Sequence, residues 1–186
     1  MKILAPDLYK IILTNKNMRT SSRNLYIIKG SERSLMIDTS WNVPECLSEM
    51  EQALNELSID CRDLDIFVTH NHVDHSGYVS FFTDRGARAF MNPVEIAASS
   101  DRYHRFYEDN DMRRSYTSEV GVTKERTPDA WQEIKAGADQ LARDNNVNFD
   151  FPFTPIAPGD RLSYGGYDFE VVSLAGHTSG QCGLVE

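Results

Sequence analysis

Residues 69–77 read Thr-His-Asn-His-Val-Asp-His-Ser-Gly and contain three of the five histidines in the chain. A short, mostly apolar run that predicts a strand comes directly before them, and ligand sites of open α/β sheets commonly lie where strands end. If the strand conformation continues, His70 and His72 project from one face, because side chains alternate with period two. A turn can then bring Asp74 and His75 back toward them. Imidazoles with one carboxylate suit zinc, with iron and manganese as alternatives, so the stretch predicts a metal site.

The competing interpretation of residues 69–77 is a polar surface loop that happens to be rich in histidine. A single histidine would favour that interpretation. Three histidines and an aspartate in the order H-x-H-x-D-H, directly after a predicted strand, favour metal binding instead.

The composition describes one globular domain with an acidic surface. The 186 residues include 19 Lys and Arg against 28 Asp and Glu, for a net charge of -9, and the mean hydropathy is -0.46. No stretch approaches the roughly 18 apolar residues of a membrane span, and the start does not resemble a signal peptide. The charge argues against a broad nucleic-acid or anionic-membrane surface. Three cysteines without a CxxC pair indicate free thiols in a reducing compartment. We therefore expect a cytoplasmic protein without a membrane or nucleic-acid partner.

Hydrophobic periodicity predicts strands early and late in the chain, with helices between them. Asn42 is the expected N-cap of a helix over 43–57, with Glu45 in capping-box position. Asn92 is expected to cap a second helix that begins at Pro93. The expected strands cover 8–13, 24–28, 35–37, 65–69, 87–91, 161–164 and 167–174, the last two joined by a Gly165-Gly166 turn, with a further helix from Thr127. This order indicates an α/β or α+β domain.

The motif at 69–77 resembles the central H-x-H-x-D-H motif of the metallo-β-lactamase fold hydrolases. Three weaker pieces agree in order. Residues 35–39 resemble the family's early strand ending in Asp, and 160–162 with the Gly-Gly turn resemble the segment before the next metal motif. Residues 175–180 read Ala-Gly-His-Thr-Ser-Gly, similar to the family's G-H-T-x-G motif. The resemblance covers 8–92 and 158–186. It implies an α+β fold, the four-layer αβ/βα sandwich.

The resemblance also implies a metal centre with one or two zinc ions, iron or manganese being possible. His70, His72 and His177 would bind one metal, while Asp74 and His75 would begin the second site. Asp74 would also orient the attacking hydroxide and so counts as a catalytic residue. Asp38 would steer a ligand histidine from outside the coordination sphere, the alternative being a turn residue at a strand end.

Two departures from the family pattern stand out. The pattern continues beyond its G-H-T-x-G motif with a bridging Asp and a last His, whereas nine residues follow His177 here (186 − 177). Cys182 is not expected to replace the bridging Asp. We expect a chain shortened at its C-terminus, which alone could be inactive. One alternative is that a partner supplies the missing ligands. The other is that the centre is limited to the three histidines.

The second departure is a stretch at about 98–150 that reads as a helical insertion within a single 1–186 domain. It could cover the site as a lid, with Tyr103, Phe106 and Trp131 lining an apolar substrate pocket. The alternative for these aromatic residues is ordinary helix packing.

The function that the resemblance implies is hydrolysis by a metal-bound hydroxide of a small-molecule ester, thioester or lactone, as in glyoxalase-II-like members. An iron-dependent redox enzyme, either a sulfur dioxygenase or a flavodiiron-like protein, is one alternative, although flavodiiron proteins carry Glu at the position of His72. A nuclease or phosphodiesterase is another, disfavoured by the acidic charge. The sequence leaves the oligomeric state open.

Overall fold

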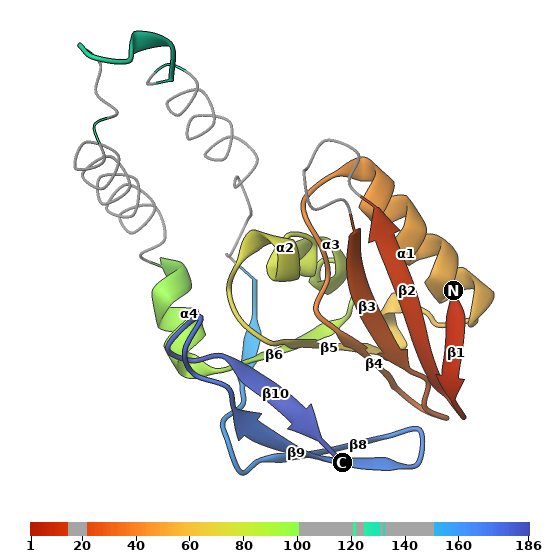
Figure 1. Ribbon diagram of the computed structural model, residues 1–186. Coiled ribbons are helices and arrows are strands. Elements are labelled where there is room, and N and C mark those ends of the chain that lie inside the picture. Colours follow the sequence, from red (N-terminus) through yellow and green to blue (C-terminus); the bar gives the residue numbers. More distant parts are fainter. Residues whose placement is uncertain (15–21, 101–120, 122–124, 131, 133–150) are drawn as a thin grey trace.

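The larger of two sheets has seven strands in the computed structural model, which describes residues 1–14, 22–100, 121, 125–130, 132 and 151–186. Its strands follow the chain order from β1 to β7 (Figure 1). Strands β1 to β4 are antiparallel, whereas β4, β5, β6 and β7 are parallel to one another. The strands are β1 (Lys2–Ala5), β2 (Leu8–Thr14), β3 (Ser22–Ile28), β4 (Ser34–Ile37), β5 (Leu64–Val68), β6 (Arg88–Met91) and β7 (Phe153–Pro155).

The second sheet is antiparallel and has the order β10-β9-β8. It consists of β8 (Arg161–Tyr164), β9 (Tyr167–Ser173) and β10 (Cys182–Val185). Gly165 and Gly166 join β8 to β9 with φ angles of 57° and 84°. Two consecutive residues with positive φ are what a type I′ hairpin turn requires, and glycine adopts them without steric cost. The predicted hairpin is confirmed.

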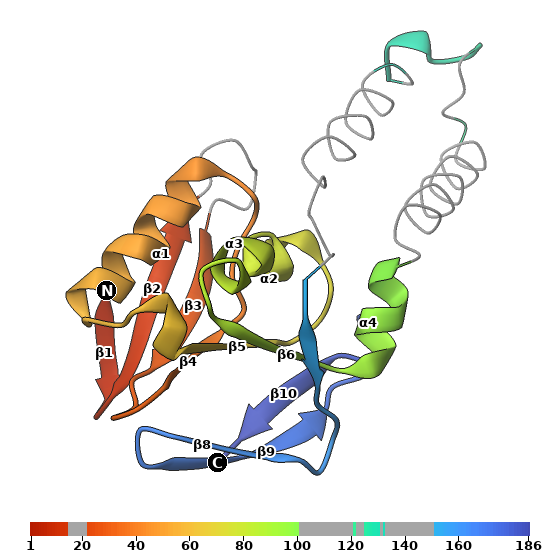
Figure 2. The same ribbon diagram turned by 180° about the vertical axis from the view of Figure 1, so that it is seen from behind.

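Helix α1 (Pro44–Glu56) covers one face of the larger sheet and buries Cys46, Met50, Ala53 and Leu54. The remaining helices are short: η1 (Cys61–Asp63), α2 (Val73–Ser76), α3 (Val79–Thr83) and α4 (Pro93–Ser100). The two views show α1 and the second sheet on different sides of the larger sheet (Figures 1 and 2).

Successive side chains of the central strands point alternately into two hydrophobic cores, one on each face of the larger sheet. Met36 and Ile66 point into the core shared with α1 and α3, whereas Leu35 and Phe67 point into the core shared with the second sheet. All four side chains are fully buried, as expected for parallel strands covered on both faces. The described residues thus form a helix layer and two sheet layers, which confirms the predicted αβ sandwich.

The predicted elements agree with the structure except at a few positions. Helix α1 begins at Pro44 with Val43 as N-cap and no side-chain cap, so the prediction of Asn42 as its cap was wrong. Asn92 does cap α4, because its side chain accepts the backbone N–H of Val94 (2.9 Å). The loop expected over 70–77 contains α2, and β1, β7 and α3 were not predicted.

Most of the expected insertion at about 98–150 lies outside the described residues. Within it, 128–130 are helical, in agreement with a helix that starts after Thr127. Among the described residues, no helix is long and apolar enough to cross a membrane.

A buried carboxylate ties the two sheets together at the amino end of β5. Asp65 is fully buried and accepts hydrogen bonds from Arg33 (2.7 and 3.0 Å), Arg88 (2.5 and 2.7 Å) and the Tyr164 hydroxyl (2.6 Å). Burial alone would raise the pKa of Asp65, but hydrogen bonds from Arg88, Arg33 and Tyr164 outweigh it and hold the pKa below its usual range. Burial likewise raises the pKa of Tyr164, so its hydroxyl remains a donor at neutral pH.

We predict that Asp65→Ala lowers the free energy of unfolding by about 3–5 kcal/mol, because it leaves partly buried guanidinium groups without their partner. Tyr164→Phe should cost about 1 kcal/mol, the value of one hydrogen bond. Both are measured as shifts of the urea unfolding midpoint. Since the pKa of Asp65 is lowered in the folded state, its contribution is complete above its unfolded pKa of about 4 and decreases as the pH falls further.

Glu170→Ala serves as the control, because the Glu170–Arg161 pair is exposed and its closest N–O distance is 3.9 Å. Exposed pairs contribute little, so this variant should unfold at nearly the wild-type midpoint. An Asp65→Ala midpoint equal to that of Glu170→Ala would show that the buried network does not stabilise the fold.

Candidate metal centre

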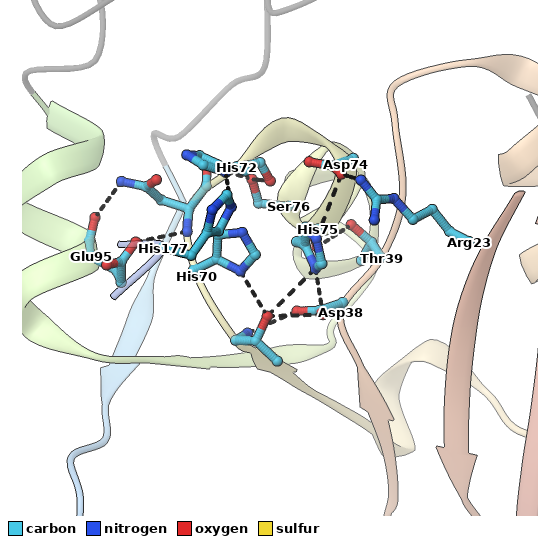
Figure 3. Close-up of polar contacts among 12 residues, drawn as sticks. Arg23, Asp38, Thr39, His70, His72, Asp74, His75, Ser76, Glu95 and His177 are labelled. Carbon is cyan, nitrogen blue, oxygen red and sulfur yellow. Dashed lines mark hydrogen bonds and ion pairs between the residues drawn. The ribbon is translucent and has the colours of Figure 1, made fainter. Parts of the chain in front are cut away.

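The predicted metal-binding residues meet at one edge of the larger sheet because β4 and β5 are parallel neighbours. Their carboxyl ends lie side by side, with Asp38 directly after β4 and Thr69 directly after β5. The chain continues from Thr69 through His70 to α2, whose first turn carries Asp74. His177 arrives from the second sheet, in the loop between β9 and β10. Figure 3 shows these side chains gathered at this edge.

Three histidines form a group that could hold a metal ion. One nitrogen from each of His70, His72 and His177 lies within 4.8 Å of the other two. The closest pair is His72 Nδ1 and His177 Nε2, at 2.9 Å. His70 is buried, His72 half-buried and His177 exposed. The three side chains therefore enclose the group on its protein side and leave it accessible to solvent at His177.

The hydrogen bonds of His70 prepare one nitrogen for a ligand. Thr69 Oγ1 donates to Asp38 Oδ2 (3.0 Å), so His70 Nδ1, also 3.0 Å from this hydroxyl, must carry the proton and donate to it. His70 Nε2 is then unprotonated, and it is buried without a hydrogen-bond partner. Burial in the first place, and then the neighbouring histidine rings, lower the pKa of His70 to about 2. A neutral imidazole with a free lone pair is what a metal ion requires.

Asp38 organises the loop that carries the histidines. Its Oδ1 accepts the backbone N–H of Thr69 (2.8 Å), and its Oδ2 lies 2.7 Å from His75 Nδ1. His75 thus donates from Nδ1 to the Asp38 carboxylate. Asp38 itself has a φ of 63°, a left-handed conformation that Asp tolerates better than most residues and that concentrates at functional sites. These contacts place Asp38 next to His75 and, through Thr69, next to His70.

Asp74 and His75 lie beside the three histidines but have other partners. Asp74 Oδ2 is 3.6 Å from His75 Nε2 and forms an ion pair with Arg23 Nη2. Figure 3 shows Arg23 reaching this carboxylate from the start of β3. The structure therefore brings all five predicted ligands to one place, and among the described residues only His70, His72 and His177 satisfy the geometry of a shared metal site.

Glu95 joins the two loops that carry the histidines, and sequence reasoning did not identify it. Its side chain is 1% exposed; Oε2 accepts the N–H of Asn71 (2.9 Å) and Oε1 accepts that of Gly180 (2.8 Å). Asn71 lies between His70 and His72, and Gly180 follows His177 by three positions. The only hint of Glu95 in the sequence was the capping pattern at Asn92, which predicted that Glu95 lies in the first turn of a helix.

Gly180 must be a glycine because the two loops approach α4 closely. A Cβ at this position would lie 2.8 Å from Val94 Cβ and 3.0 Å from the Glu95 side chain. The final glycine of the G-H-T-x-G pattern therefore allows this loop to reach the Glu95 carboxylate. The aromatic residues proposed as a substrate pocket, Tyr103, Phe106 and Trp131, lie outside the described residues.

Comparisons with solved structures show where else this fold occurs. A metallo-beta-lactamase family protein from Thermus thermophilus has a TM-score of 0.68 and 23% identity, covering 98% of this chain and 56% of its own. A beta-lactamase domain protein from Burkholderia ambifaria has a TM-score of 0.70 and 18% identity, covering 97% of this chain and 51% of its own. A subclass B3 metallo-beta-lactamase of Bradyrhizobium japonicum has a TM-score of 0.55 and 16% identity, covering 97% and 54%.

These identities show a shared fold, and this chain spans about half the length of the structures it matches. No curated protein sequence shows significant similarity to it. The sequence profile of the metallo-beta-lactamase superfamily, whose members are generally metal-dependent hydrolases, matches residues 18–185. That match includes the whole histidine cluster, and the sandwich of helices and two sheets agrees with it. The chain belongs to the metallo-beta-lactamase superfamily.

Proposed function

We propose that this chain carries a zinc-dependent hydrolase centre that acts on a small-molecule ester, thioester or lactone. The observation that carries the proposal is the convergence of His70, His72 and His177, with the buried Nε2 of His70 left without a hydrogen-bond partner. A buried nitrogen without a partner is costly unless something binds it. Membership of a superfamily of metal-dependent hydrolases supports the reaction class.

The donor set favours zinc over iron. Three neutral imidazoles with access for a fourth ligand are a common catalytic zinc arrangement. Non-haem iron oxygenases instead use two histidines and one carboxylate, and here the carboxylate of Asp74 is paired with Arg23. This comparison supports the hydrolase over the iron-dependent redox alternative.

His70, His72 and His177 would hold the zinc ion, which would act as a Lewis acid and make hydroxide available at neutral pH by lowering the pKa of bound water. The protein residues supply orientation. Asp38 and Thr69 fix the proton on His70 Nδ1, so that Nε2 faces the centre. His177 is the exposed member of the three histidines, so a substrate carbonyl would approach the centre from the side of His177. Asp74 would accept a hydrogen bond from the attacking water, which is the catalytic role expected for it.

The proposal is tested on the purified chain loaded with zinc, against a panel of thioesters, lactones and carboxylic esters. We expect hydrolysis of at least one class, and His72→Ala should lower kcat/KM by at least about a hundredfold because it removes one of three ligands. His104→Ala is the matched control, because His104 belongs to neither of the sequence motifs at 69–77 and 175–180, and it should retain wild-type activity. Bound iron with oxygen consumption would instead favour the redox alternative, and absence of any metal binding would contradict the proposal.

A second prediction concerns Glu95, whose two oxygens each accept one backbone N–H. An amide offers one acceptor, so Glu95→Gln must break one of these two bonds and let the loops of His72 and His177 separate. We expect zinc affinity to fall about 10–100-fold, as is typical when residues supporting metal ligands are changed. The readouts are zinc competition with a chelator and the visible absorption spectrum of the cobalt-substituted protein.

Glu49→Gln is the matched control, because Glu49 also accepts one backbone N–H, that of Thr14 (3.1 Å), from helix α1. It should leave zinc affinity and the cobalt spectrum unchanged. If Glu95→Gln lowers the melting temperature but also leaves both metal readouts unchanged, Glu95 stabilises the fold without positioning the ligands.

A further inference from the structure

The second metal position that the superfamily resemblance implies does not fit the residues as the structure arranges them. Asp74 and His75 are its expected first ligands, and their nearest side-chain atoms are 3.6 Å apart. The Asp74 oxygen in that contact, Oδ2, is also the atom that pairs with Arg23. A guanidinium group thus binds the carboxylate oxygen that faces His75.

Strand pairing explains how Arg23 reaches this carboxylate. Strands β3 and β4 are antiparallel, with Tyr26 opposite Ile37. Arg23 precedes Tyr26 by three residues, so it lies at the edge of the sheet where β4 ends and Asp38 follows. The start of β3 therefore lies at the same edge of the larger sheet as the histidine cluster, although Arg23 and the histidines are far apart in the sequence.

The Arg23 side chain is held on more than one side. Its Cζ lies 5.2 Å from the centre of the Trp41 ring, and Trp41 is 6% exposed. A guanidinium above an aromatic face is attracted by the negative potential of the ring. The Asp74 side chain is 15% exposed and that of Arg23 41%, so the pair is shielded from water mainly on its Asp74 side. These contacts keep the guanidinium at Asp74.

We propose that Arg23 replaces the second metal ion of this centre: the chain binds one zinc at His70, His72 and His177, and the guanidinium supplies the positive charge at Asp74. This inference rests on the proposed zinc-dependent function. Arg keeps its charge at all physiological pH values and has no lone pair for a metal, so it repels a cation that would bind Asp74 and His75.

The test is zinc stoichiometry of the full chain, measured by elemental analysis after dialysis against buffered zinc and by calorimetric titration. Wild type should bind one zinc. Arg23→Ala should bind a second zinc. The affinity for this second zinc should exceed any second-site affinity of the wild type by at least about tenfold, the smallest effect expected when a residue in contact with a metal ligand is changed. Arg23→Lys keeps the charge and should remain at one. The double variant Arg23→Ala, Asp74→Asn should lose the second zinc again.

Arg62→Ala is the matched control, because Arg62 also pairs with an Asp but at an exposed position away from the centre. It should bind one zinc, and circular dichroism establishes that each variant is folded. Two zinc ions of similar affinity in wild type, or equal stoichiometry in wild type and Arg23→Ala, overturn the inference while leaving the proposed function intact. No zinc in any variant overturns the proposed function, and this inference with it.

Discussion

The hydrogen bond from Thr69 Oγ1 to Asp38 Oδ2 determines which nitrogen His70 offers at the centre. A hydroxyl has one proton to donate, so once it is given to Asp38, the hydroxyl can only accept from His70 Nδ1. The same Asp38 oxygen lies 2.7 Å from His75 Nδ1. One carboxylate thereby holds Nδ1 of His75 directly and Nδ1 of His70 through the Thr69 hydroxyl. The parallel pairing of β4 and β5 is what brings Asp38 within reach, because their carboxyl ends lie at the same edge.

His177, the third histidine of the group, comes from the other sheet, and its position depends on separate contacts. Cys182 N–H donates to the Thr69 carbonyl (3.0 Å), which attaches β10 to the end of β5. Glu95 then joins the loop before β10 to the loop after β5. Cys182 and Glu95 are both buried, so water competes weakly for the groups that they bond. The three-histidine centre is therefore a property of how the two sheets meet as well as of the motif at 69–77.

Sequence reasoning identified the local patterns and the residues with distinctive chemistry. The strands at β2 to β6, helix α1, the Gly165-Gly166 turn and the five candidate ligands were all found, because periodicity and ligand type are visible in short stretches. Arg23 and Glu95 were missed because nothing local distinguishes them: an Arg at a strand start and a Glu in a first helical turn are common on surfaces. Their roles arise from tertiary contacts between segments far apart in sequence. Short elements such as α3 and β7 were missed for the related reason that packing stabilises them more than local propensity does.

Strand β5 shows why one of its ends can bind a ligand and the other cannot. At its amino end, Asp65 is surrounded by Arg33, Arg88 and Tyr164, so every strong acceptor position of the buried carboxylate is used. At its carboxyl end, His70 uses Nδ1 within the protein and leaves the buried Nε2 without a partner. A satisfied buried network contributes stability and has nothing left to offer, whereas an unsatisfied buried nitrogen costs stability unless a ligand binds it. The folding free energy gained from the hydrogen bonds of Asp65 can therefore offset the cost of burying His70 Nε2 without a partner. Whether the buried polar groups are satisfied by the protein itself distinguishes the structural network at one end of β5 from the candidate binding centre at the other.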